Sequence, residues 1–404
     1  MMRVLFFRKV LGKTSIFAIF LILSFIFTNN LFGQSYPLWG ELKAGKHQVG
    51  FRSVWKFDHS RRYTLKDANN SSKKTIPRPL LINVWYPAKE QSSSKHMKYR
   101  EYFDILTNDP KLKDLADLYR KHNLSTLAEL TLSKSRDQFN EKEEKIFAEF
   151  LDSRTASIKD GSALSAKFPV VIYHQGFGAS FEDNSVLCEY LASNGFIVIG
   201  SSYLKENGTS LGIDGKEGSV RDIAYLLNFA NDLPHADTSK VAMVGHSGGA
   251  QASVIAKSKT HLAIDAVVSL DTTQDPFSLS DPRWNNFTIP VLKNKEQMKG
   301  TLLAFAEYSA YFELYDSLKN MNRIYISMPK VVNHDDYISQ GISARRLKNK
   351  LKPNADNETK AVEKYYRQIC EYIFAFLQRE LKSKRQVKNY FKNNFSSGLM
   401  GFFA

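Results

Sequence analysis

One serine of the chain, Ser247, stands in a setting that could make its hydroxyl reactive. It lies in the sequence GHSGG at 245–249, which follows the apolar run 241–244 and precedes a stretch of small residues. A serine hydroxyl becomes a useful nucleophile when it is held clear of the backbone beside a general base, and a sharp strand-to-helix turn does this where the flanking residues are small. The pattern predicts such a nucleophile elbow. The alternative is an ordinary glycine-rich turn with an unreactive serine.

A second glycine-containing segment, HQGFG at 174–178, follows the apolar run 169–173. Attack of a serine on a carbonyl creates an oxyanion that needs two N–H donors aimed at it. The backbone N–H groups of Phe177 and of Gly248, directly after the serine, are the two predicted donors. The alternative for this segment is a plain loop between a strand and a helix.

The general base is expected in the loop after the last strand of the sheet. Among nine histidines only His334 has this position, because it follows the predicted strand 323–327. The chain order serine, acid, histidine is typical of hydrolases with a parallel sheet and a nucleophile elbow. His334 is therefore the predicted base, whereas His174 and His246 are expected to be loop residues that shape the pocket.

The acid that orients the histidine has two candidates on the residues alone. Asp271 and Glu307 each follow a predicted strand, and either could place a carboxylate at the catalytic edge of the sheet. Asp275, Asp335 and Asp336 are weaker candidates, since the last two are too close to His334 in sequence to need a catalytic role.

The elements that must position these residues follow a regular pattern. Two early apolar runs predict an antiparallel start of the sheet, and six later runs separated by helical patterns predict parallel strands buried on both faces. A helical pattern with apolar residues from 362 to 376 closes the series. Such alternation indicates an α/β fold with a mostly parallel central sheet, antiparallel N-terminal strands and helices on both faces. The runs are 49–55, 80–86, 169–173, 196–199, 241–244, 266–270, 302–305 and 323–327.

The chain divides into three parts. Residues 1–33 carry four basic residues before the apolar run 16–27, as a signal peptide does. That run is shorter than the roughly 20 residues that span a bilayer, so export to the periplasm or the medium after cleavage is favoured over an N-terminal membrane anchor. Residues 34–404 are predicted to be one catalytic domain. Within it, the charged and helical segment 89–166 is predicted to be an insertion that caps the mouth of the active site.

Composition excludes several other classes of protein. The formal net charge is +15, but the basic residues are spread along the chain and no signature of a nucleic-acid-binding domain accompanies them. No nucleic-acid partner is expected, and the basic surface leaves peripheral contact with anionic membranes open. No CxxC or HExxH pattern occurs, so no metal and no cofactor are expected. Cys188 and Cys370 each lie in a helical pattern, which favours two separately buried thiols over a disulfide. The sequence indicates no oligomeric state.

Several segments together resemble the secreted type of platelet-activating factor acetylhydrolases and, more broadly, dienelactone-hydrolase-related esterases of the α/β-hydrolase superfamily. The resemblance implies the α/β-hydrolase fold, Asp271 as the triad acid, Glu307 as a residue that is not catalytic, and Phe177 and Gly248 as the oxyanion positions. The family often has a bulky residue after the serine, where this chain has glycine. The likeness covers about residues 78–88 and 168–340 and does not extend to the insertion. Its segments are SNGFIV at 193–198, GFGA at 176–179, GHSGGA at 245–250, LD at 270–271, AEY at 306–308 and VNHDD at 332–336.

The combined prediction is a serine esterase in which Ser247 attacks, His334 transfers protons and Asp271 orients the imidazole. The resemblance favours a small-molecule or lipid ester as the substrate, with short acyl chains, including those of oxidised or acetylated phospholipids. Lactones, acetylated carbohydrates and polyesters stay open as substrates. Two other classes of function also stay open: a member of the fold that binds a partner without catalysis, and an acyltransferase that uses the same acyl-enzyme.

Overall fold

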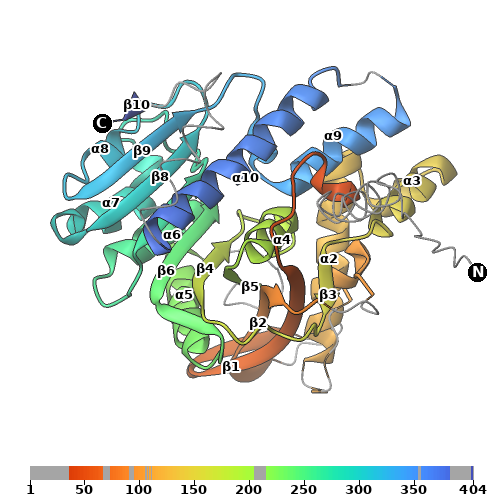
Figure 1. Ribbon diagram of the computed structural model, residues 1–404, viewed down its shortest axis with the longest axis horizontal. Helices are drawn as coiled ribbons and strands as arrows, with labels where there is room; N and C mark the ends of the chain where they lie inside the picture. The colour runs from red at the N-terminus through yellow and green to blue at the C-terminus, as the bar shows by residue number, and fades with distance from the viewer. Residues whose placement is uncertain are drawn as a thin grey trace, which may run out of the picture.

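A mixed sheet of ten strands runs through the computed structural model of the chain (Figure 1). The structure describes residues 36–66, 73–90, 95–104, 107, 109–110, 112–203, 215–353, 356–382 and 402–403. The predicted signal peptide, residues 1–33, therefore lies outside the described residues. The strand order is β10-β9-β8-β7-β6-β4-β5-β2-β1-β3.

The middle of the sheet is parallel, as predicted. Each of these strands pairs in parallel with its neighbour, and their carboxyl ends lie along one edge of the sheet. The apolar runs form strands because Val, Ile and Leu side chains pack well on a pleated surface that is covered on both faces. The strands are β4 (Phe168–His174), β5 (Ile197–Ser201), β6 (Ala236–His246), β7 (Ala266–Leu270), β8 (Gly300–Ala306) and β9 (Met321–Ser327).

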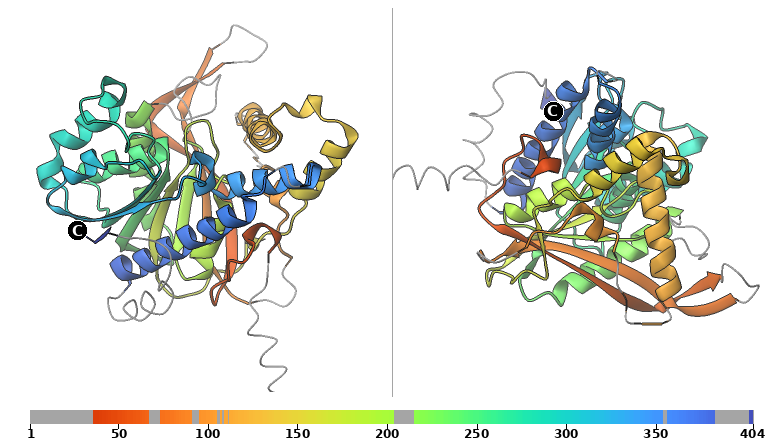
Figure 2. Two further views of the ribbon diagram at one scale, coloured as in Figure 1. Left: turned by 90° about the horizontal axis from the view of Figure 1, so that it is seen from above. Right: turned by 90° about the vertical axis from the view of Figure 1, so that its right-hand side faces the viewer.

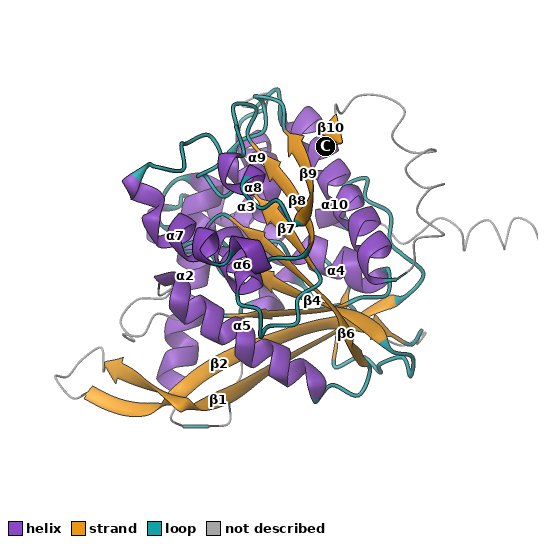
Figure 3. Ribbon diagram, turned by 90° about the vertical axis from the view of Figure 1, so that its left-hand side faces the viewer, coloured by secondary structure: helices purple, strands orange, loops and turns teal. Residues whose placement is uncertain are grey.

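The N-terminal hairpin is much longer than its apolar runs. The strands β1 (Gln48–Lys66) and β2 (Lys73–Ala88) pair antiparallel with each other, and β2 pairs antiparallel with β5. Their far ends project from the body of the molecule (Figures 2 and 3). Arg61 and Arg78 both contact the buried carboxylate of Asp222, at 2.6 and 2.7 Å, and so fix the polar part of the hairpin to the helix beside it.

Helices cover both faces of the sheet. Alternate residues of β4 show the division, because Val170 and Ile172 belong to one hydrophobic core and Val171 and Tyr173 to the other. The helices over the first core are α5 (Gly215–Asn231), α6 (Gly248–Ser258), α7 (Asn285–Lys293) and α8 (Glu313–Asp316), and the principal helices over the second are α4 (Ser185–Ser193), α9 (Ser339–Leu351) and α10 (Thr359–Leu381).

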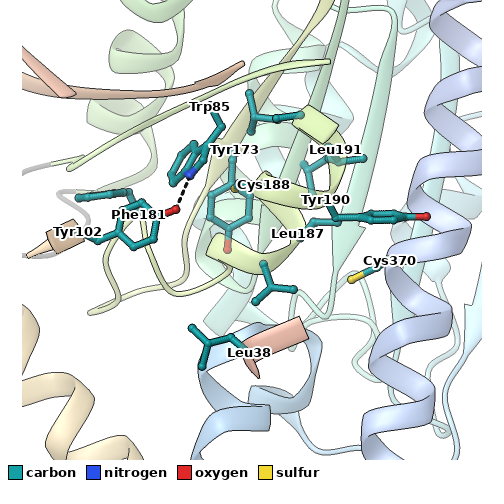
Figure 4. Packing of buried hydrophobic residues seen from close by; sticks show 14 of the residues in the cluster. Leu38, Trp85, Tyr102, Tyr173, Phe181, Leu187, Cys188, Tyr190, Leu191 and Cys370 are labelled. Carbon is teal, nitrogen blue, oxygen red and sulfur yellow. Dashed lines mark hydrogen bonds between the residues drawn. The ribbon is translucent and has the colours of Figure 1, made fainter. Parts of the chain in front are cut away.

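The second core is rich in aromatic side chains (Figure 4). Trp85 donates a hydrogen bond of 3.0 Å to the hydroxyl of Tyr102, and both rings lie close to Phe181. Cys188 on α4 and Cys370 on α10 are buried here and are not bonded to each other, which agrees with the prediction of two separate thiols.

The segment predicted as an insertion contains two long helices and one strand that the sequence did not predict. The helices are α2 (Lys113–Leu132) and α3 (Glu141–Leu151), and the strand β3 (Ser157–Lys159) pairs in parallel with the edge strand β1. Both helices pack against α9. None of the helices in the described part of the chain combines the length and the apolar character needed to span a membrane.

At the other edge of the sheet, the two-residue strand β10 (Phe402–Phe403) pairs antiparallel with β9. Residues 383–401, which connect α10 to β10, lie outside the described residues.

Candidate active site

Ser247 lies at the sharp turn between β6 and α6. Its backbone angles are φ 54° and ψ −123°, a conformation that a residue with a side chain rarely adopts and that must be held by its surroundings. Its N–H donates to the carbonyl of Leu270 on the neighbouring strand, at 2.9 Å. The serine therefore stands where the sequence predicts it, at the carboxyl edge of the parallel strands.

The glycines of the GHSGG sequence are required by close backbone contacts. A Cβ atom on Gly245 would lie 2.4 Å from the carbonyl oxygen of Gly249. A Cβ on Gly249 would lie 2.3 Å from the carbonyl oxygens of both His174 and Gln175, at the end of β4. Only glycine fits at these two positions, because no side chain could relieve a clash with the backbone.

His334 and Asp271 are brought together by the fold. Asp271 is the first residue after β7, and its Oδ2 accepts a hydrogen bond of 2.8 Å from Nδ1 of His334. The carboxylate is buried, whereas the imidazole is 36% exposed. With Nδ1 donating to Asp271, the Nε2 atom is left without a proton and can accept one from a hydroxyl.

The carboxylate also sets the charge state of the histidine. Burial lowers the pKa of His334, but the hydrogen bond and the negative charge of Asp271 outweigh it, so the pKa is raised above its usual value. Smaller contributions to the same rise come from the charges of Asp335 and Glu307. The imidazolium that forms during proton transfer is therefore stabilised in this loop.

The histidine loop also contacts the residue that precedes the serine. Nε2 of His246 donates to the backbone carbonyl of His334 at 3.0 Å, and the two rings lie 4.7 Å apart. Burial lowers the pKa of His246 to about 3, so this side chain is neutral at physiological pH. The backbone around Ser247 is thus bonded both to the strand that carries Asp271 and to the loop that carries His334.

The segment that contains Phe177 lies against the serine. A Cβ on Gly176 would lie 3.3 Å from Cβ of Ser247, so the loop passes directly beside the nucleophile. Gly178 has φ 76°, which lets the chain turn sharply there. Gly248 is the first residue of α6, where helix N–H groups have no intrahelical partner. Both predicted oxyanion donors thus belong to segments that adjoin Ser247.

A buried carboxylate beneath this segment was not marked by any sequence pattern. Asp183 accepts a hydrogen bond from the hydroxyl of Tyr173, the residue directly before the segment 174–178. Its own backbone carbonyl accepts from the N–H of Gln340 at 2.9 Å and from the hydroxyl of Ser339 at 3.0 Å. Because Ser339 begins α9, five residues after His334, Asp183 connects the oxyanion segment to the histidine loop.

A second set of side chains holds the histidine loop from the other side. Asp336 accepts two hydrogen bonds from Arg345, each of 2.7 Å, and a third from the N–H of Asn333. Arg345 also contacts Asp356 at 2.6 Å. Asp336, a weak candidate for the catalytic acid, is therefore part of the support of the loop.

The remaining acidic candidates lie near the site without contacting the imidazole directly. Of the two carboxylates that the residues alone left open, Asp271 is the one that hydrogen-bonds His334. Glu307 instead accepts from the hydroxyl of Ser309 at 2.9 Å. Asp275 is buried, and this burial raises its pKa to about 7, with a further contribution from the charge of Asp271.

The fold and the site define a class of protein: an α/β-hydrolase with a serine at a nucleophile elbow and a histidine–aspartate pair at the same edge of the sheet. Residues 79–207 match the family model "Platelet-activating factor acetylhydrolase, isoform II", and residues 160–279 match the model "Chlorophyllase". No curated protein matches the chain.

The solved structures support the same fold. A ferulic acid esterase from Streptomyces cinnamoneus superimposes with a TM-score of 0.52 over 84% of this chain and 92% of that chain, at 15% sequence identity. The predicted fold class and the predicted resemblance to platelet-activating factor acetylhydrolases are thereby confirmed. Taken together, the matches indicate a serine hydrolase of the esterase type.

Proposed function

We propose that this chain hydrolyses carboxylic esters through an acyl-enzyme formed on Ser247. The observation that carries the proposal is the 2.8 Å hydrogen bond between Asp271 and His334, in a loop that also contacts the residue before a serine held at φ 54°. A serine in a strained turn, a histidine with a free Nε2 and a buried carboxylate are the groups that acyl transfer needs.

In the proposed reaction, Nε2 of His334 accepts the proton of Ser247 as the hydroxyl oxygen attacks the ester carbonyl. The backbone N–H groups of Phe177 and Gly248 stabilise the oxyanion. His334 then gives the proton to the leaving alcohol, and the acyl group stays on the serine. Water attacks this acyl-enzyme with the same histidine as base, which releases the acid and restores the serine. Asp271 orients the imidazole throughout.

The proposed substrates are esters with short acyl chains, including acetylated or oxidised phospholipids. The match of residues 79–207 to the platelet-activating factor acetylhydrolase model supports this choice. The basic and apolar pattern of residues 1–33 supports export. Without this segment, which has four basic and no acidic residues, the chain keeps a net charge of +11, which would favour contact with anionic lipid surfaces. The packing of α2 and α3 on α9 supports the proposed role of residues 89–166 as a cap beside the histidine loop.

The test combines a probe for an activated serine with a series of esters. The wild-type chain should be labelled by a fluorophosphonate and should hydrolyse p-nitrophenyl esters, fastest with short acyl chains. Ser247→Ala should abolish labelling and lower kcat by on the order of 10⁶-fold. Ser239→Ala is the matched control, because Ser239 is exposed at the opposite end of the same strand.

Three results would contradict the proposal. Absence of labelling in the wild-type chain would indicate a binding protein without catalysis. Unchanged turnover in Ser247→Ala would remove the serine from the mechanism. An added alcohol that captures the acyl group in preference to water would identify an acyltransferase.

A further inference from the structure

Exposed aromatic side chains gather at the catalytic edge of the sheet. Among the described residues, five large hydrophobic side chains remain exposed, and three of them follow the strands that flank the site. Phe177 is 70% exposed and follows β4, whereas Tyr308 and Tyr311 are 55% and 70% exposed and follow β8. Exposed aromatic rings beside a reactive centre are candidates for contact with a ligand, because their exposure to water is unfavourable until they are covered.

The two tyrosines stand on a backbone that is firmly held. The N–H groups of Tyr311 and Phe312 both donate to the carbonyl of Asp275, at 3.0 and 3.3 Å. The ring of Phe312 is buried and stacks on Tyr325 with 4.5 Å between the ring centroids. The backbone of this loop is therefore held by the loop after β7 and by β9, and Tyr308 and Tyr311 extend from it toward solvent.

The ring of Tyr308 lies on the histidine side of the site, and Tyr311 follows it in the same loop. Nζ of Lys330 lies 5.9 Å from the centre of the Tyr308 ring, and Lys330 comes four residues before His334 in the same loop. Glu307, the neighbour of Tyr308, lies close enough for its charge to act on His334. Phe177, by contrast, is in the segment that passes beside Ser247.

The position of the rings relative to His334 determines which part of an ester they can contact. In the proposed function, on which this inference rests, His334 gives a proton to the leaving alcohol, so the alcohol part of the ester must lie beside the imidazole. The acyl part stays on Ser247. We propose that Tyr308 and Tyr311 form the subsite for the alcohol part of the substrate and that this subsite selects alcohols that carry an aromatic ring.

Two isomeric esters can test this assignment. The isomers 2-phenylethyl acetate and ethyl phenylacetate carry the same ring on the alcohol side and on the acyl side, respectively. In the double variant Tyr308→Ala/Tyr311→Ala, kcat/KM for 2-phenylethyl acetate should fall about five- to tenfold, mainly through KM, because stacking is lost. The values for ethyl phenylacetate and ethyl acetate should stay within about twofold.

Further variants separate stacking from general damage. Tyr308→Phe/Tyr311→Phe keeps the rings and should retain the preference for 2-phenylethyl acetate. Ile289→Ala removes an exposed apolar side chain from α7, outside the loops that flank Ser247, and should leave all three esters unaffected. Fluorophosphonate labelling of Ser247 should remain unchanged in every one of these variants.

Several outcomes would overturn the assignment. An unchanged kcat/KM for 2-phenylethyl acetate, an equal loss for both isomers, or a selective loss for ethyl phenylacetate would each do so. Binding to anionic phospholipid vesicles that is lost in the double variant, with unchanged ester selectivity, would assign the rings to a membrane surface instead. If the wild-type chain shows neither labelling nor turnover, the proposed function fails and this subsite fails with it. If labelling and ethyl acetate turnover persist, only the subsite is at stake.

Discussion

The elbow that carries Ser247 and the loop that carries His334 reach the same site by different physical means. The elbow is held by the backbone, because close contacts at Gly245 and Gly249 leave no room for a side chain. The histidine loop is held by side chains, through the pair of Arg345 with Asp336 and through the hydrogen bonds at Ser339.

This difference determines how each region should respond to mutation. A close contact between backbone atoms tolerates no added atom, so a single substitution at Gly245 or Gly249 should disrupt the whole elbow. A protein can lose one side chain of such a network and still fold. Each substitution in the histidine loop should therefore displace the loop only in part. Asp183 connects the histidine loop to the strand beside the elbow, since it accepts a hydrogen bond from Tyr173 on β4 and its carbonyl accepts one from Ser339 at the start of α9.

Among changes outside the catalytic side chains, the largest loss of kcat is expected at the elbow. In Gly249→Ala the new Cβ would lie 2.3 Å from two backbone carbonyl oxygens, so β4 and α6 must separate. The free energy of unfolding should fall by about 3 kcal/mol. Because the serine is displaced, kcat should fall by on the order of 10²-fold. Urea denaturation and the rate of fluorophosphonate labelling measure the two quantities.

Gly200→Ala is the control for this prediction. Gly200 is buried in the neighbouring strand β5, but a Cβ there would meet nothing closer than 3.6 Å. Its stability and labelling should resemble those of the wild-type chain. If Gly249→Ala behaves in the same way, the steric account of the elbow is wrong.

A smaller loss of kcat, with at least as large a loss of stability, is expected in the histidine loop. Arg345→Met would leave Asp336 buried without its cationic partner, which should cost about 3–5 kcal/mol of stability. At temperatures where the variant is folded, kcat should fall roughly tenfold with little change in KM, because the imidazole is held less firmly. Thermal unfolding and steady-state kinetics provide the measurements.

Two further variants sharpen the result. Addition of Asp336→Asn to Arg345→Met removes the unpaired charge and should restore part of the stability. Arg52→Met breaks an exposed pair with Asp160 and should change stability by less than about 1 kcal/mol. Equal losses in Arg345→Met and Arg52→Met would show that the loop does not depend on its buried pair.

The same difference explains what the sequence could and could not reveal. The elbow, the parallel strands and the resemblance could be predicted because glycine spacing and apolar runs are local patterns. The residues that hold the histidine loop escaped prediction because no regular spacing marks them: Arg345 and Asp336 are nine residues apart, and Asp183 is 156 residues from Ser339. The helix α9 was not predicted either. Its first residues, Ser339, Gln340 and Gly341, are polar or small and show no apolar helical pattern, although they are buried in the structure.

The acid that orients His334 could be predicted only in part from the sequence. Asp271 and Glu307 both follow strands, and residue type alone could not separate them. Asp271 is the one that reaches Nδ1 of His334 in the structure, because β7 is adjacent to the strand that carries Ser247. The assignment therefore depends on strand order, which the resemblance implied and which local patterns do not contain.

The pH dependence of activity should follow the charges around His334. Burial lowers the pKa of His334, and Asp271 raises it by more, so the acid limb of kcat/KM should lie above pH 6.5. Activity requires the neutral imidazole and therefore falls as the pH decreases through the raised pKa of His334. Stability has the opposite sign: the contribution of the ion pair is fully present below the unfolded pKa and is lost as pH rises through the raised folded pKa.

Two conservative variants test the predicted direction of the pKa shift of His334. Asp271→Asn removes the main group that raises the pKa of His334, so its acid limb should move to lower pH, and its kcat should fall by on the order of 10⁴-fold if the aspartate orients the imidazole. Glu307→Gln removes only the last and smallest of the contributions that raise the pKa of His334, so its acid limb should shift downward by less than that of Asp271→Asn, with kcat within about threefold. The pH profiles of kcat/KM for both variants provide the measurement. If kcat falls further in Glu307→Gln than in Asp271→Asn, the acid that orients His334 is Glu307 and not Asp271.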